Sequence, residues 1–262
     1  MFKFNSARKQ AATLLAALGV WGLLAPNADA NAVVVSHDIN TLASFVAGAQ
    51  ESTFAVNVAT FLTSGDATKN LLLFESNPGN GTRNFAPAVL NALTGAGFNV
   101  TVTANYATPF AGFDALFVAQ DFPTVGFLDN AALISYVNSG GSVYLAGGVG
   151  PSPVGEAAGW NTFLNHYGLA FASVYNDFTS VGITSTHPIF AGVTALGSGI
   201  GQSIIDLGIN PNAQVVQTKL GQNVYAVVSI PVPEPQVYAL LLIGLGFVGL
   251  VVRRRAQTGT AR

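Results

Sequence analysis

Apolar residues in the middle of the chain recur in two alternating patterns, which predict β-strands separated by α-helices. Six segments carry the continuous or alternating apolar runs that are typical of strands: 32–37, 70–76, 98–105, 113–122, 142–150 and 224–230. Four segments carry apolar residues at helical spacing: 52–65, 84–97, 127–141 and 159–169. Asp129 is predicted to cap the third of these helices. The alternation predicts an α/β domain with a parallel sheet and helices on both faces.

The first thirty residues follow a different pattern. Lys3, Arg8 and Lys9 precede an apolar run at 11–25, and small residues follow at Ala28 and Ala30. Basic, apolar and small-residue regions in this order predict a cleaved secretory signal peptide rather than a permanent N-terminal anchor. Residues 1–30 are therefore set aside, and residues 31–230 are expected to form one domain.

The chain closes with a short uncharged span between two distinctive polar groups. Pro233, Glu234 and Pro235 precede residues 237–252, which carry no charge, and Arg253, Arg254 and Arg255 follow. A helix over 237–252 would reach roughly 24 Å at about 1.5 Å per residue, against about 30 Å of bilayer hydrocarbon. With its flanking residues it can just span, so one C-terminal transmembrane helix is predicted, with the arginines on the cytoplasmic side.

This order of elements within residues 231–262 resembles the PEP-CTERM sorting signal of Gram-negative bacteria. The resemblance implies that an exosortase-type membrane protease recognises the tail. It also implies export, a transient stay in the inner membrane, and delivery to the cell surface or the exopolysaccharide matrix. The alternative is a plain tail anchor in which the Pro-Glu-Pro sequence is incidental.

Composition narrows the classes of partner. Only 8% of residues are charged, and the chain contains no cysteine. Between residues 33 and 230, ten carboxylates stand against three basic side chains, Lys69, Arg83 and Lys219, which gives a net charge near −7. No basic stripe is present that could neutralise phosphates, so a nucleic-acid partner is not expected.

Residues 70–207 resemble the class I glutamine amidotransferase-like superfamily, which has a flavodoxin-like fold. The resemblance rests on the order of five phrases: NLLLFESNPG, FDALFVAQDF, ALISYVNSGGSVYLAGG, WNTFLNHYGLAF and STHPIFAGVTAL. Active members carry a nucleophilic cysteine after the corresponding strand, and Gly148 stands at that place here. His187 is followed by Pro188 and Ile189 where the family has glutamate two residues on. Without nucleophile and triad, glutamine hydrolysis is not expected.

A ligand crevice is predicted where the parallel strands end, because open α/β sheets bind ligands there. The candidate residues, in chain order, are Glu75, Ser76, Asn77, Arg83, Gln120, Asp121, Ser152 and Glu156. Glu75 and Asp121 could form the carboxylate pair of a glycoside hydrolase. The alternative is that polar residues gather at strand ends because turns need them.

No cofactor or metal site is predicted. The three histidines, His37, His166 and His187, are dispersed and lack the spacing of zinc ligands. The leading hypothesis is an exported binding or structural component of the extracellular polysaccharide matrix, with polysaccharide as its candidate ligand. The alternatives are a carbohydrate-active hydrolase that uses the strand-end carboxylates, and an idle passenger of the sorting system.

Overall fold

The computed structural model describes residues 31–43, 46–75, 84–119, 128–148, 152–231 and 243–245. Residues 30–231 form one compact unit, to which residues 1–29 and 232–262 do not belong. The predicted signal peptide, Pro233–Pro235 and Arg253–Arg255 lie outside the described residues, as does nearly all of the span 237–252. Within the ranges given above, none of the helices has the length and hydropathy needed to cross a bilayer.

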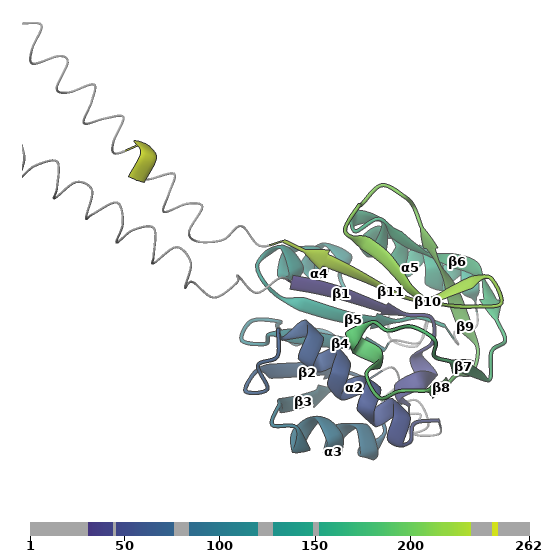
Figure 1. Ribbon diagram of the computed structural model, residues 1–262. Helices are drawn as coiled ribbons and strands as arrows, with labels where there is room; N and C mark the ends of the chain where they lie inside the picture. The colour runs from purple at the N-terminus through teal and green to yellow at the C-terminus, as the bar shows by residue number, and fades with distance from the viewer. Residues whose placement is uncertain are drawn as a thin grey trace, which may run out of the picture. The chain divides into compact units, whose positions relative to one another are not determined.

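A large sheet forms the centre of the domain (Figure 1). Five of its strands run parallel, in the spatial order β3-β2-β4-β5-β1. Their bounds are β1 (Asn31–Ser36), β2 (Asn70–Phe74), β3 (Asn99–Thr103), β4 (Ala115–Ala119) and β5 (Ser142–Ala146). All five were predicted from their apolar runs, and the parallel arrangement of these five is confirmed.

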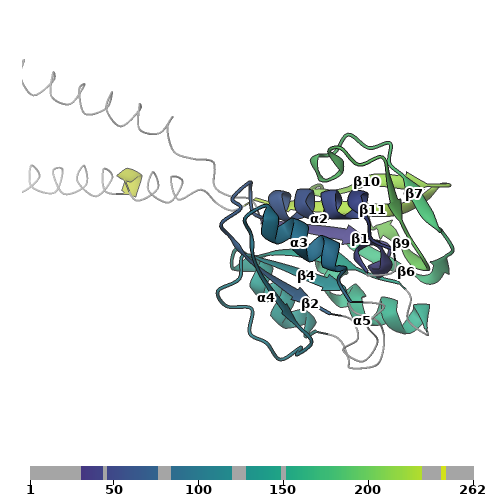
Figure 2. The ribbon, with the colours of Figure 1, turned by 90° about the horizontal axis from the view of Figure 1, so that it is seen from below.

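Helices cover both faces of the sheet, as the sequence predicted. They are α2 (Ala49–Leu62), α3 (Pro87–Gly95), α4 (Asn130–Asn138) and α5 (Pro153–His166). Figure 2 shows α2 and α3 together on one side and α4 and α5 on the other. Asp129 caps α4 as expected, because its carboxylate accepts the N–H of Ala131 at 2.9 Å.

The prediction of an entirely parallel sheet is wrong for the last third of the chain. The strands there are β6 (Leu169–Asn176), β7 (Ser180–Gly182), β8 (Ala195–Gly197), β9 (Gly201–Asp206), β10 (Ala213–Lys219) and β11 (Gln222–Ile230). In the large sheet β11 pairs antiparallel with β1, and β9 and β6 follow it in alternating directions. β7 and β8 form a separate antiparallel pair, and a short 3-10 helix, η2 (Pro188–Phe190), lies between them in the chain.

The cause of this antiparallel arrangement is the length of the connections. Parallel neighbours need a long crossover, usually a helix, whereas antiparallel strands can be joined by a two-residue turn. No α-helix occurs between α5 and the end of β11 at Ile230, a stretch that the structure describes in full. Leu220 and Gly221 join β10 to β11 with positive φ angles of 49° and 77°, as in a type I′ hairpin turn.

The core consists of two apolar layers, one on each face of the sheet. Strand β1 contributes to both, since Val34 packs on the side of α2 while Val33 and Val35 pack on the side of α5. Trp160 of α5 and Tyr144 of β5 are among the largest fully buried side chains. A strand buried on both faces has a continuous apolar run, which is why β1 is recognisable in the sequence.

Candidate functional site

The carboxyl ends of the parallel strands are the place where the sequence predicted a ligand crevice. Of the candidate residues, the described part of the chain includes only Glu75, Ser152 and Glu156. The others fall outside the described residues: Ser76, Asn77, Arg83, Gln120 and Asp121. The proposed pairing of Glu75 with Asp121 therefore stays a prediction.

Glu75 directly follows β2 and is half-buried. Its backbone N–H donates to the carbonyl of Thr103 at 3.0 Å, and its carbonyl accepts the hydroxyl of Tyr106 at 2.6 Å. Tyr106 belongs to the loop between β3 and β4, where its ring and that of Phe110 pack against Phe74. Burial raises the pKa of the Glu75 carboxyl above its usual range.

The side chains of Ser152 and Glu156 stabilise the local fold by accepting hydrogen bonds from neighbouring groups. The Ser152 hydroxyl oxygen caps α5 by accepting the N–H of Gly155 at 3.1 Å. Glu156 is fully buried, so it does not line an open crevice as the sequence suggested. Its two carboxylate oxygens accept the N–H of Gly148 at 2.7 Å and the hydroxyl of Tyr175 at 3.1 Å. A buried carboxylate held by donors in this way fixes the turn after β5.

Gly148 occupies the position where the resemblance placed a missing nucleophile. Its φ angle is +93°, and a Cβ built there would lie 2.6 Å from the carbonyl oxygen of Ile200 and 2.7 Å from the Cα of Gly201. Both neighbours are backbone atoms, which cannot move aside as a flexible side chain can. No residue other than glycine fits here, and the strand end carries no exposed side chain at this point.

The backbone that fills this space belongs to residues 197–201, GSGIG, which we call the glycine segment. Buried carboxylates hold it: Glu51 accepts the N–H of Gly197 at 2.7 Å, and Asp38 accepts the hydroxyl of Ser198 at 2.8 Å and the N–H of Gly199. Both carboxylates come from the region that follows β1. The glycine segment thus covers the carboxyl end of β1 and β5, an arrangement that the sequence analysis missed.

His37 is buried beneath the glycine segment. A Cβ on Gly201 would lie 2.1 Å from its Nδ1, and the rings of Tyr225 and Phe178 pack against it at centroid distances of 5.7 and 6.2 Å. Burial lowers the pKa of His37 from 6.5 to about 4, an effect that the nearby side chains of Asp38 and Asn176 partly offset. The ring is therefore neutral at neutral pH.

This burial predicts a loss of stability in acid. The unfolded chain binds a proton at His37 below a pH of about 6.5, while the folded domain does so only near pH 4. The contribution of neutral His37 to the free energy of unfolding is fully present above pH 6.5. It falls by about 3 kcal/mol as the pH drops to 4. Urea unfolding of the His37→Phe variant should show a weaker pH dependence in this window. His166→Phe, which changes an exposed histidine, should keep the wild-type dependence; equal slopes for both variants would refute the assignment.

Another phrase of the amidotransferase resemblance, Thr186-His187-Pro188-Ile189, leads into η2. His187 caps this turn, since its Nδ1 accepts the N–H of Ile189 at 3.4 Å, and its ring packs on Phe61 at 5.2 Å. Burial lowers its pKa. Across the described ranges, no three His, Asp or Glu side chains gather in a way that could hold a metal ion.

The comparison with protein families identifies the end of the chain. The family model described as PEP-CTERM protein-sorting motif matches residues 231–255. The chain carries a PEP-CTERM sorting motif. This confirms the prediction made from Pro233–Pro235 and Arg253–Arg255, which all lie in the matched segment. The motif indicates an exported protein that is processed at a membrane by exosortase, itself a membrane protein.

No curated protein and no solved structure matches this chain. The PEP-CTERM match covers only the tail, and it leaves the central domain, residues 31–230, without an identified relative. The amidotransferase resemblance of this domain receives no support from the comparisons and stays a prediction.

Proposed function

We propose that this PEP-CTERM protein is delivered to the cell surface or exopolysaccharide matrix of a Gram-negative bacterium, where its domain binds or organises other components without catalysing a reaction. In this proposal the C-terminal helix holds the precursor in the inner membrane until an exosortase-type protease removes it. Extracellular polysaccharide is the proposed ligand class. The domain then remains outside the cell as a folded α/β unit.

One observation carries the non-catalytic part of the proposal, namely the packing around Gly148. Sheets of this kind bind substrates beyond the carboxyl ends of their strands. At the ends of β1 and β5 this region is occupied by the glycine segment, which the buried carboxylates of Asp38 and Glu51 hold by hydrogen bonds. A strand end covered by protein backbone offers neither a nucleophile nor space for a substrate.

A second candidate function rests on Glu75. A half-buried carboxyl with a raised pKa is suited to donate a proton to a glycosidic oxygen. The sequence offers Asp121 as the second carboxylate, two positions along the chain from Ala119, the last residue of the neighbouring strand β4. This alternative makes the chain a carbohydrate-active hydrolase.

Mature protein purified from the cell surface distinguishes the two functions. We expect it to bind at least one polysaccharide of a broad panel and to release no reducing sugar from any of them. If hydrolysis does occur, Glu75→Gln and Asp121→Asn should each lower its rate at least about a hundredfold, consistent with loss of a general acid or its partner. Asp177→Asn, which changes an exposed carboxylate outside the predicted crevice, is the control. Hydrolysis that depends on Glu75 would replace the binding proposal with the hydrolase.

A further inference from the structure

The two ends of the domain leave it at a single place. Asn31, the first residue of β1, is paired with Ile230, the last residue of β11. Strand β11 is held on both sides near this point, by β1 through Val228 and Val33 and by β10 through Val228 and Ala213. The residue from which the sorting tail departs is therefore part of a firmly paired strand.

The distance between this strand and the Pro-Glu-Pro sequence is short. Three residues lie between Ile230 and Glu234, and the four steps from one Cα to the next cover at most about 3.6 Å each, or roughly 14 Å in all. Pro231, Pro233 and Pro235 restrict the backbone to extended conformations. A protease that holds Glu234 in its active site must therefore meet this end of the folded domain, because no long linker keeps the two apart.

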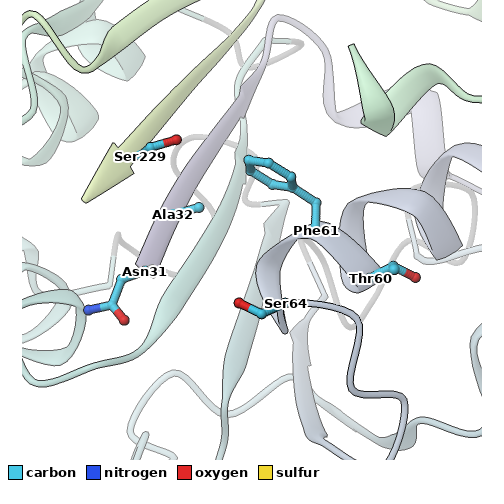
Figure 3. Close-up of a pocket in the computed structure, with 6 residues that line it drawn as sticks. All are labelled: Asn31, Ala32, Thr60, Phe61, Ser64 and Ser229. Carbon is cyan, nitrogen blue, oxygen red and sulfur yellow. The ribbon is translucent and has the colours of Figure 1, made fainter. Parts of the chain in front are cut away.

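This end of the domain carries a groove of about 320 Å³ between α2 and the strands β1 and β11 (Figure 3). The residues that line it are Asn31, Ala32, Thr60, Phe61, Ser64 and Ser229. Figure 3 shows the ring of Phe61 pointing from α2 toward β1, beside Ala32. Ser229 is exposed near the end of β11, two residues before Pro231, where the chain leaves the strand.

The chemistry of the groove favours an uncharged, apolar guest. None of the six lining residues carries a charge, and the half-buried ring of Phe61 provides an apolar surface, whereas Ala32 beside it is buried. Two of the polar groups are already engaged within the domain: Thr60 donates to the carbonyl of Val56 at 2.8 Å and Asn31 to that of Val137 at 2.8 Å. The volume suits one or two apolar side chains, whereas a stable dimer interface buries about 800 Å² on each partner.

We propose that this groove is a docking site for the exosortase-type protease, which inserts an apolar side chain of its water-exposed surface over Phe61 while it processes the tail. The inference rests on the proposed function, since it assumes that such an enzyme cleaves this chain. Docking positions the folded domain against the enzyme and adds affinity to the short sorting motif. The rate of cleavage then depends on the surface of the central domain as well as on the sorting motif.

The test measures how fast the full-length precursor is cleaved in the native cells by pulse labelling. Ser229→Trp fills the groove from its exposed rim and should slow cleavage at least about fivefold, as the loss of one buried contact would. Ser173→Trp places the same side chain at an exposed serine of β6 and should leave the rate unchanged. Equal rates for wild type and Ser229→Trp would overturn the docking site.

A second change covers the case in which Ser229→Trp does not fold. A flexible insertion of about ten Gly and Ser residues after Pro231 separates the motif from the groove, and we expect slower cleavage because the effective concentration of the docking contact falls. Unchanged or faster cleavage would contradict docking. Failure of the proposed function has a different signature, since the wild-type precursor itself would then not be cleaved.

Discussion

Replacing Gly148 with alanine is expected to lower the free energy of unfolding by about 3 kcal/mol or more. The new Cβ would overlap the backbone of Ile200 and Gly201 at 2.6 and 2.7 Å, so the glycine segment would have to move. That movement strains the hydrogen bonds that this segment donates to the carboxylates of Asp38 and Glu51. The positive φ of Gly148 adds about 1 kcal/mol of backbone strain.

Urea unfolding monitored by the fluorescence of Trp160, which is fully buried, measures this loss. Gly112→Ala is the matched control, because Gly112 has a similar φ of +88° but no atom within 4 Å of the built Cβ. The free energy of unfolding of the control should fall only by the strain of its positive φ, about 1 kcal/mol. Equal losses for the two variants would mean that the space beside Gly148 is not closed, and the argument against catalysis at this strand end would fail.

Replacing Pro233, Glu234 and Pro235 together with alanine is expected to abolish processing of the precursor. The apolar span 237–252 and the arginines at 253–255 remain in this variant, so the chain should still enter the inner membrane and stop there. The protease would lose the residues by which the tail is recognised. Full-length protein should accumulate in the inner membrane, and the cell surface should lose nearly all of it.

Cell fractionation with immunoblotting measures this change. The matched control replaces Gln257, Thr258 and Gly259 with alanine, three residues that follow the arginines and lie outside the matched segment 231–255. Its distribution should equal that of the wild type. Normal surface delivery of the Pro-Glu-Pro variant would mean that the tail acts as a plain anchor.

Much of the fold could be predicted from the sequence because four of the five parallel strands, β1, β2, β4 and β5, are buried on both faces. Their continuous apolar runs, such as Leu71–Phe74, do not depend on distant parts of the chain. The direction of a strand is a different matter. The run 224–230 predicts a strand, but its hairpin with β10 is closed by Leu220-Gly221, which lacks the Asn-Gly sequence typical of such turns. Its antiparallel pairing with β1 joins the two ends of the domain, which no local pattern predicts.

The candidate site was less predictable, because it depends on contacts between residues far apart in the chain. Glu51 accepts the N–H of Gly197 and Asp38 the hydroxyl of Ser198, across separations of 146 and 160 residues. Acidic residues are mostly exposed, so the sequence alone suggests a surface position for Glu156, which is in fact buried. The lack of a side chain at Gly148 could be predicted, but not the backbone that fills its place.

The intact mass of protein released from the cell surface decides whether this chain is sorted and processed through its PEP-CTERM motif. We expect a mature chain that begins near residue 31 and ends close to Pro235, without the apolar span and the arginines. A surface protein whose mass extends to Arg262 would contradict it.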